Sequence, residues 1–355
     1  MLPALDGVRA VAIVPVVLFH TDFSRLLPGG AVGVDLFFVL SGFLITTLLL
    51  EERARCGGIG IPAFYARRAL RLGPALLLLL AAAWLLSFIP ALAESTPSEV
   101  ARFSLYVLTY TSNWILALQL QHWPALLGHI WSLAVEEQYY LVWPVVLSLL
   151  LARGARLRSI AIGLLLLVAG LALWRALLWH QLHDVHRVYF ATDTRASGLL
   201  FGSVLGVVRE SGLRLPARAS AVVVACGLLL YGWTIAHVDQ QTSSRLLLGL
   251  KLVELSAGAM IFALGAGERQ PVARWLESAP LVWIGRRSYG IYLWHVPMLY
   301  AAYHLLAWGR IGNTLAGVAA TIASAALSYR FVERPLLRYK GRFERPARPL
   351  QPQAA

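Results

Sequence analysis

Residues 72–89 read LGPALLLLLAAAWLLSFI, a run without a single charged side chain. A hydrocarbon core of about 30 Å needs roughly 20 helical residues, so a run of this length is close to a full crossing. A second long apolar stretch covers residues 160–178, and others recur along the chain. The runs are continuous and do not alternate with polar positions, which favours membrane-spanning helices over the strands of a membrane barrel.

The composition supports this interpretation. Hydrophobic residues make up 58% of the 355 positions and charged residues only 14%, whereas soluble domains carry about 25% charged residues. We predict an all-α polytopic membrane protein of about ten transmembrane helices, formed by residues 1–335 and followed by a basic, disordered tail over 336–355. The expected spans are 7–27, 32–50, 72–90, 126–151, 159–179, 196–208, 219–236, 246–265, 281–306 and 314–333, with a re-entrant or interfacial helix over 103–120.

Basic residues give the chain a formal net charge of +13. They cluster in alternate short loops, as the positive-inside rule describes, so we expect a lipid bilayer as the partner and no nucleic acid. The remaining loops hold few of them. This asymmetry predicts that both termini are cytoplasmic. No cleavable signal peptide is evident, so we expect the first apolar segment to remain as a membrane helix.

Three polar residues of the first two spans are candidates for a function inside the membrane. Arg9 and His20 share one face of a helix, about 16 Å apart along its axis. Asp35 begins the next helix after a tight connection, level with His20. A carboxylate beside an imidazole suits a general base. Arg9 can also be a snorkelling topogenic charge, His20 a packed core residue, and Asp35 a carboxylate favoured by the helix dipole.

Further polar groups follow. Arg68 and Arg71 lie one turn apart and can hold an anionic phosphate, or simply anchor the cytoplasmic face. Ser132, Glu136 and Tyr140 recur every four residues and form one polar stripe. The outer loop with His180, His183, Asp184 and His186 has spacing too loose for zinc, so we predict no metal site.

Seven short motifs follow one another along the chain, and together they resemble the acyltransferase-3 family of membrane O-acyltransferases. That family includes bacterial O-antigen and exopolysaccharide acetylases and macrolide acyltransferases. The motifs are LDGVRAVAIVPVVLFH (5–20), GVDLFFVLSGFLIT (33–46), RRALRLGP (67–74), HIWSLAVEEQYYLVWP (129–144), TRASGLLFG (194–202), SYGIYLWHVP (288–297) and FVERP (331–335).

The resemblance implies a role for each matched residue. It implies that His20 is the catalytic base, supported by Asp35, and that Glu136, ranked above Glu137, belongs to the same catalytic group. The acyl-CoA path is then Arg9, Arg68 and Arg71, and the residues lining the site are Ser132, Tyr140, Arg195, Tyr292 and His295. Some members carry a C-terminal extracytoplasmic domain. The chain ends 20 residues after Pro335, so we expect none here.

The leading hypothesis is therefore a multi-pass enzyme of the bacterial inner membrane. It would move an acyl group, with acetyl the leading candidate, from cytoplasmic acyl-CoA to a hydroxyl of a carbohydrate-bearing acceptor, without a metal. A continuous passage between Arg68 and His20 is expected. The alternatives are a proton-coupled transporter or flippase for a glycan or lipid-linked intermediate, in which the buried ionisable groups relay protons, and a catalytically idle scaffold of a polysaccharide-export complex.

Overall fold

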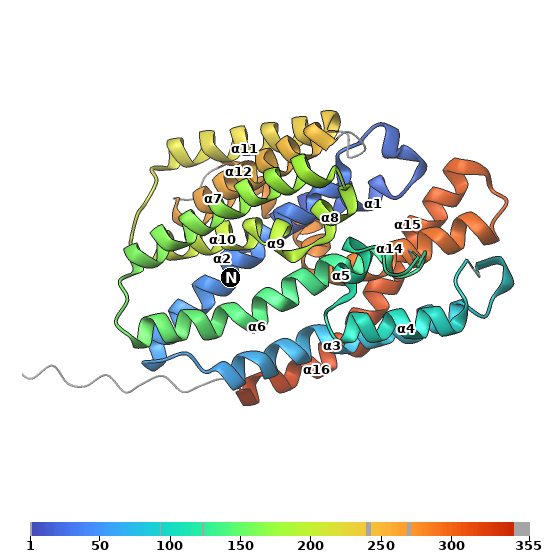
Figure 1. Ribbon diagram of the computed structural model, residues 1–355, viewed down its shortest axis with the longest axis horizontal. Helices are drawn as coiled ribbons and strands as arrows, with labels where there is room; N and C mark the ends of the chain where they lie inside the picture. Colours follow the sequence, from blue (N-terminus) through green and yellow to red (C-terminus); the bar gives the residue numbers. More distant parts are fainter. Residues whose placement is uncertain (1, 93, 123, 239–242, 268–270, 344–355) are drawn as a thin grey trace, which may run out of the picture.

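The structure is a computed structural model, and it describes residues 2–92, 94–122, 124–238, 243–267 and 271–343. Within these ranges the chain is built from helices, with one isolated β-bridge between Leu215 and Gly267 and no β-strand. Ten of the helices in the described ranges have at least 14 residues. Figure 1 shows how they are arranged. They are α1 (Pro3–Phe19), α2 (Gly33–Cys56), α3 (Ile61–Leu86), α6 (Trp131–Ala152), α7 (Leu157–Leu182), α10 (Ser197–Glu210), α11 (Ala217–His237), α12 (Ser243–Ala266), α14 (Ala279–Leu305) and α15 (Gly309–Ser328).

Short helices connect the long ones. The α-helices among them are α4 (Pro97–Leu108), α5 (Ser112–Ala117), α8 (Val185–Phe190), α9 (Thr192–Arg195), α13 (Pro271–Leu276) and α16 (Arg334–Leu337). Short 3₁₀ segments are η1 (Asp22–Arg25), η2 (Gly30–Val32), η3 (Pro90–Leu92), η4 (Gly128–Ile130) and η6 (Arg338–Phe343), and Tyr329–Glu333 (η5) is a π-helix.

Every segment expected to span the membrane overlaps one of the long helices. Among the described residues, six helical segments are also long and apolar enough to cross a membrane. They are Gly30–Cys56, Ile61–Leu86, Leu157–Leu182, Ala217–His237, Leu247–Ala266 and Gly309–Phe343. The chain is thus a multi-pass membrane protein. Of the other predicted spans, α1 and α10 have only 17 and 14 residues, and α6 and α14 carry charged side chains.

Helix α2 lies at the centre of the bundle. In its most apolar window 83% of the residues are buried, against 17% for α7. The outer face of α7 exposes Leu165, Leu166 and Leu173, as a helix facing lipid tails would. Asp35, Thr46 and Thr47 of α2 are therefore enclosed by protein.

Glycines allow α10 to pack directly against α2. A Cβ at Gly202 would lie 2.0 Å from the carbonyl oxygen of Val39, and one at Gly42 would lie 1.8 Å from that of Leu199. Small residues of this kind let membrane helices approach backbone to backbone. The α2–α10 contact brings Arg195, just before α10, close to Asp35 at the start of α2.

Gly202→Ala is expected to lower the melting temperature in detergent, because its added methyl would collide with the backbone of Val39. A backbone segment inside a helix cannot move away as a flexible side chain can. Overpacking of this kind costs about 1–3 kcal/mol. The control is Gly170→Ala on α7, where a Cβ meets nothing within 4 Å. There the better helix propensity of alanine should leave stability unchanged or raise it. Equal melting temperatures for the two variants would contradict this account of the contact.

Residues 103–120 do not form the single re-entrant or interfacial helix that was predicted. They are divided between α4 and α5, with the break at Tyr110, whose φ is +57°. A left-handed residue cannot continue a right-handed helix. Helix α4 packs against α3, and α5 packs against α6 and α8.

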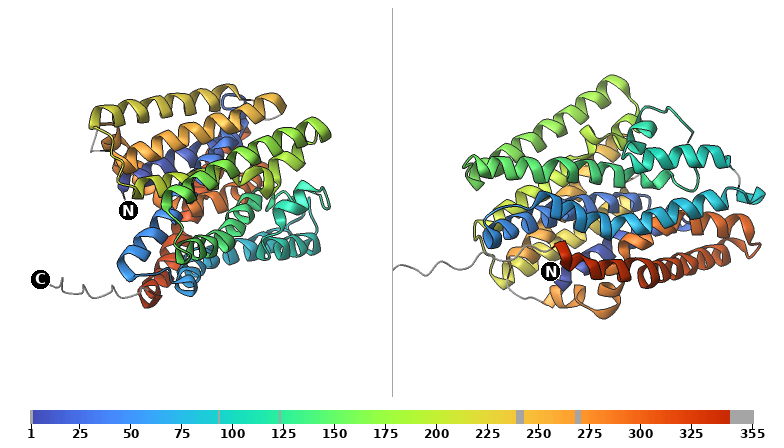
Figure 2. Two further views of the ribbon diagram at one scale, coloured as in Figure 1. Left: turned by 60° about the vertical axis from the view of Figure 1, so that its left-hand side comes forward. Right: turned by 90° about the horizontal axis from the view of Figure 1, so that it is seen from below.

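The turns between α2 and α3, between α6 and α7, and between α10 and α11 lie at the same end of the bundle (Figures 1 and 2). We call it the arginine-rich end, because Arg53, Arg67, Arg153 and Arg209 lie there. Arg67 Nη1 donates to the carbonyl of Phe343 at 2.7 Å, and Arg209 pairs with Glu51 at 3.1 Å.

The first part of the predicted tail is ordered. Residues 336–343 belong to α16 and η6 at the arginine-rich end, where the disordered tail was expected to start. Residues 344–355, over which the same prediction extends, lie outside the described residues.

Candidate active site

A cavity of about 120 Å³ lies between α1, α2, α3, α6 and α14. We call it the arginine cavity. Its polar lining comes from Arg9, Ser41, Arg68, Arg71, Ser132, Glu136, Tyr140, Ser288, Tyr289 and Tyr292. The three arginines predicted to bind acyl-CoA thus share one cavity with the predicted stripe of α6.

The stripe of α6 is confirmed as a structural feature. Glu136 accepts hydrogen bonds at 3.2 Å from the hydroxyls of Tyr140 and Ser41. Ser132 lies one turn earlier, and its hydroxyl is 2.7 Å from that of Tyr292. Ser41 was missed by sequence reasoning. A lone serine in an apolar helix gives little signal, and its partner on α6 is 95 residues away.

Glu136 and Glu137 have different surroundings. Glu136 faces the arginine cavity. Glu137 forms an ion pair with Arg68, with Nη2 and Oε1 at 2.8 Å and a second contact from Nε at 3.1 Å. The guanidinium of Arg68 also lies 3.1 Å from the ring centroid of Tyr140, so it is fixed on two sides. Of the two glutamates, Glu136 is therefore the one available to a ligand.

The three arginines of the cavity differ in how far their charge is compensated. Arg9 pairs with Asp6 at 2.9 Å, and Asp6 also contacts Arg286 at 3.3 Å. Arg68 is paired with Glu137. Among the residues that the structure describes, no hydrogen bond or ion pair engages the guanidinium of Arg71, which is exposed at the cavity wall. Arg71 is thus the arginine best able to take up an anionic group.

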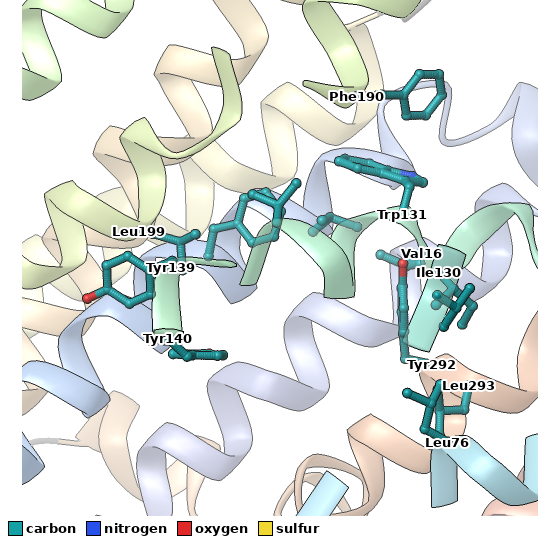
Figure 3. Packing of buried hydrophobic residues seen from close by; sticks show 14 of the residues in the cluster. Val16, Leu76, Ile130, Trp131, Tyr139, Tyr140, Phe190, Leu199, Tyr292 and Leu293 are labelled. Carbon is teal, nitrogen blue, oxygen red and sulfur yellow. The ribbon is translucent and has the colours of Figure 1, made fainter. Parts of the chain in front are cut away.

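A second cavity, of about 260 Å³, lies where α1 ends, beside the start of α6 and under α8. We call it the histidine cavity, because His20, His129 and His186 line it. Trp131 and Phe190, whose ring centroids are 5.1 Å apart, form part of its aromatic wall (Figure 3). The Nδ1 atom of His20 lies 2.8 Å from the carbonyl oxygen of Val16.

The predicted pairing of Asp35 with His20 is wrong. Asp35 is almost completely buried and forms an ion pair with Arg195 at 3.0 Å. Arg195 is itself buried, and a buried cation requires a counter-charge. Its carboxylate contacts the guanidinium of Arg195, the last residue of α9, and not the imidazole of His20.

Arg195 was predicted to line the site, but it lines neither cavity. Its guanidinium lies 4.7 Å from the ring centroid of Tyr189 and 5.3 Å from that of Trp131, and both of these residues line the histidine cavity. Arg195 therefore packs against the aromatic wall on the side that faces away from the histidine cavity.

The continuous passage expected between Arg68 and His20 is instead two adjoining cavities. Val34 and Tyr292 line both of them. The Tyr292 hydroxyl donates to the carbonyl oxygen of His129 and contacts Ser132. These hydrogen bonds fix the Tyr292 ring where the arginine cavity and the histidine cavity adjoin, close to Val16 in Figure 3. Arg9 lines the arginine cavity and His20 lines the histidine cavity.

His295 lies one turn beyond Tyr292 on α14 and is fully buried. Its ring centroid is 4.8 Å from that of His20. His295 was predicted to line the site; it lies beside His20 but lines neither cavity.

The family model described as an acyltransferase domain matches residues 2–332. This chain belongs to the acyltransferase-3 family. The seven motifs lie on α1, α2, α3, η4 with α6, α9 with α10, α14, and η5 with α16. Five of them contribute residues to the two cavities; the motifs over 194–202 and 331–335 do not.

Curated relatives carry the name O-acetyltransferase. The peptidoglycan O-acetyltransferase OatA of Listeria monocytogenes is 34% identical over 94% of this chain and 56% of its own length. The putative peptidoglycan O-acetyltransferase YrhL of Bacillus subtilis is 33% identical over 94% of this chain and 55% of its own. The O-acetyltransferase OatA of Staphylococcus aureus is 33% identical over 96% and 58%.

The chain thus spans little more than half the length of these relatives. No solved structure matches it significantly.

Proposed function

We propose that this protein transfers an acetyl group from acetyl-CoA to a hydroxyl of a carbohydrate of the bacterial cell envelope. The observation that carries the proposal is the adjacency of two cavities with complementary chemistry. One holds three arginines, the other holds His20, and Val34 and Tyr292 lie between them. Membership of an acyltransferase family favours this function over the transporter, flippase and scaffold alternatives.

The arginine cavity is suited to the donor. Coenzyme A carries a pyrophosphate and a 3′-phosphate, and guanidinium groups bind phosphate oxygens through charge-assisted hydrogen bonds. Arg71 would supply a guanidinium that no ion pair engages among the described residues, while Arg9 and Arg68 would bind without giving up their carboxylate partners. With the phosphates at this level, the thioester arm would extend toward Tyr292. To reach His20 it would pass Val34 and Tyr292, which line both cavities.

His20 is the proposed general base. If Nδ1 carries the proton donated to the Val16 carbonyl, Nε2 is left with a lone pair. Nε2 would then remove the proton of the acceptor hydroxyl as its oxygen attacks the thioester carbonyl. A C–O bond forms, the C–S bond breaks, and the coenzyme leaves as a thiolate. The Asp35–Arg195 pair would act at a distance, by holding the aromatic wall of the cavity.

The acceptor is proposed to be a carbohydrate, because two of the relatives are named as peptidoglycan O-acetyltransferases. Trp131, Tyr189 and Phe190 offer the histidine cavity flat apolar faces and, in tyrosine and tryptophan, polar edges. Such a surface matches the apolar faces and hydroxyl groups of a sugar ring.

We also propose that the bundle crosses the bacterial inner membrane ten times, with both termini cytoplasmic. The positive-inside rule supports this orientation, since the arginine-rich end would then face the cytoplasm. The arginine cavity would be on the side where acetyl-CoA is made, and the histidine cavity on the side of the envelope glycans.

The experiment that tests the function uses purified protein in detergent, acetyl-CoA labelled in the acetyl group, and solubilised cell-envelope glycans. We expect label in an ester that mild base releases from the glycan. Boiled protein and a reaction without glycan are the controls. Absence of protein-dependent ester with every glycan fraction would contradict the proposal.

Arg71→Gln is expected to raise the KM for acetyl-CoA about 10- to 100-fold, because a hydrogen bond to a charged group contributes about 1.5–3 kcal/mol. The KM for the acceptor should change little, since Arg71 lies in the other cavity. The matched control is Arg158→Gln, which removes an exposed charge at the start of α7. If both variants raise the KM equally, general surface charge binds the coenzyme and the cavity does not.

A further inference from the structure

Three imidazoles from distant parts of the sequence meet beside the histidine cavity. His20 comes from the end of α1, His129 from η4 and His295 from α14. The ring of His295 makes edge-to-face contacts with the other two, with centroid distances of 4.8 Å to His20 and 5.0 Å to His129. His295 is thus the central member, and His20 is the one most exposed to the cavity.

Each of the three rings has one nitrogen beside a backbone carbonyl oxygen. His20 Nδ1 is 2.8 Å from Val16 O, His295 Nδ1 is 2.6 Å from Tyr292 O, and His129 Nε2 is 3.1 Å from Leu293 O. A carbonyl only accepts, so in each neutral ring that nitrogen carries the proton and the other presents a lone pair.

The remaining nitrogens of the buried rings have no partner. His295 Nε2 and His129 Nδ1 are enclosed and make no hydrogen bond. A buried polar atom without a partner is destabilising, and such atoms at native sites call for an explanation. No group of three or more His, Cys, Asp or Glu side chains among the described residues has the geometry to hold a metal ion. Asp35, which was expected to pair with His20, is instead paired with Arg195.

We propose that His20, His129 and His295 form a cluster that stores one proton during acyl transfer. This inference rests on the proposed function. When all three rings are neutral, the nitrogens not bonded to a carbonyl are all acceptors, so no ring can donate a hydrogen bond to another. One added proton turns one of these nitrogens into a donor. His20 would receive that proton on Nε2 and share it with His295, and His129 would extend the cluster inward. His295 and His129 are then positioning residues that act through His20.

The proton balance is simple. The O–H bond of the acceptor breaks and its proton enters the cluster through His20. The C–O bond of the new ester forms, and the C–S bond of the thioester breaks. The stored proton then returns through His20 to the departing thiolate and forms an S–H bond. The cluster ends the cycle neutral, and no oxidant or reductant is needed.

Other titratable groups share the cavity and must be separated from the cluster in any test. His186 and Tyr189 face it from α8, and Tyr292 faces it from α14. His186 is the important one, because it is also an imidazole. The His186→Gln variant therefore serves as the background in which the cluster is observed.

The first test observes ¹⁵N-histidine signals of the full chain in detergent as the pH is lowered, without any substrate. We expect His20, His129 and His295 to shift together in one step that corresponds to one proton. In His295→Gln, His20 and His129 should titrate independently. Three unrelated titrations in the parent protein would overturn the proposal. Since no acyl transfer is measured, this result does not depend on whether the proposed function holds.

The second test measures acetyl transfer. His295→Gln is expected to lower kcat about 10- to 100-fold with unchanged KM for the donor and the acceptor, a fraction of the full general-base effect. His129→Gln should give a smaller loss in the same direction. The control is His237→Gln, an exposed residue of α11 that stacks on Trp233. Melting temperatures identify any variant that fails to fold. A folded His295→Gln protein with the parent kcat would refute the role of the cluster.

Discussion

Replacing His20 with glutamine is expected to lower kcat for acetyl transfer about 100- to 10,000-fold, the range that a positioned general base contributes. Glutamine keeps a polar group at the end of α1 but cannot take up a proton at neutral pH. Binding of acetyl-CoA should be preserved, because the arginine cavity lies on the other side of Tyr292. The measurement is the initial rate with labelled acetyl-CoA, together with the thermal shift that coenzyme A produces.

The matched control for this variant is His304→Gln, which changes an exposed histidine at the far end of α14. It should transfer label at the parent rate. The two readouts separate the possible failures of the proposal. Parent-like transfer by a folded His20→Gln protein would show that another group is the base. Loss of the coenzyme A thermal shift in the same variant would show that the two cavities do not act separately.

Asp35→Leu is expected to destabilise the protein by about 3–5 kcal/mol, because it leaves the buried guanidinium of Arg195 without its counter-charge. Two guanidinium nitrogens of Arg195, Nε and Nη1, already lack hydrogen-bond partners, so the carboxylate is its main compensation. The measurement is the melting temperature in detergent, and for so large an effect a marked fall in the yield of folded protein is also expected.

The double variant Asp35→Leu/Arg195→Met tests whether the unpaired charge of Arg195 causes the loss of stability. Replacing a buried ion pair by apolar residues is often neutral or stabilising, so the second substitution should restore much of the stability that the first removes. If Asp35 instead supported His20, the double variant would be no more stable than the single one. In that case Asp35→Asn would reduce transfer without affecting the melting temperature.

The helices of this protein were predictable because the signals that specify them are local. Leu72–Ile89 has no charged side chain and Ile160–Leu178 has one, Arg175, and each stretch lies largely within a helix, α3 or α7. The stripe of Ser132, Glu136 and Tyr140 was predictable for the same reason, since residues four apart share a helix face. The end of α1 was not. It stops at Phe19 and not near residue 27, because the chain turns into η1.

Contacts between distant segments could not be read from the sequence. Asp35 was assigned to His20 because their helices are adjacent, but a helix has several faces, and the close α2–α10 packing gives Asp35 a buried cation 160 positions away. The partition of the expected passage into two cavities likewise depends on Tyr292, whose hydroxyl meets α6 and η4 from α14.

Hydropathy and the order of the motifs were enough to predict the helical membrane architecture, the family and the set of ionisable residues available inside the bundle. Which of these residues meet depends on how the helices pack. Hydrophobicity and helical periodicity act over a few turns, so they can be summed along the chain. An ion pair or a cluster of imidazoles depends on how three or four helices are rotated and shifted relative to one another. The packing of the whole bundle sets these rotations and shifts.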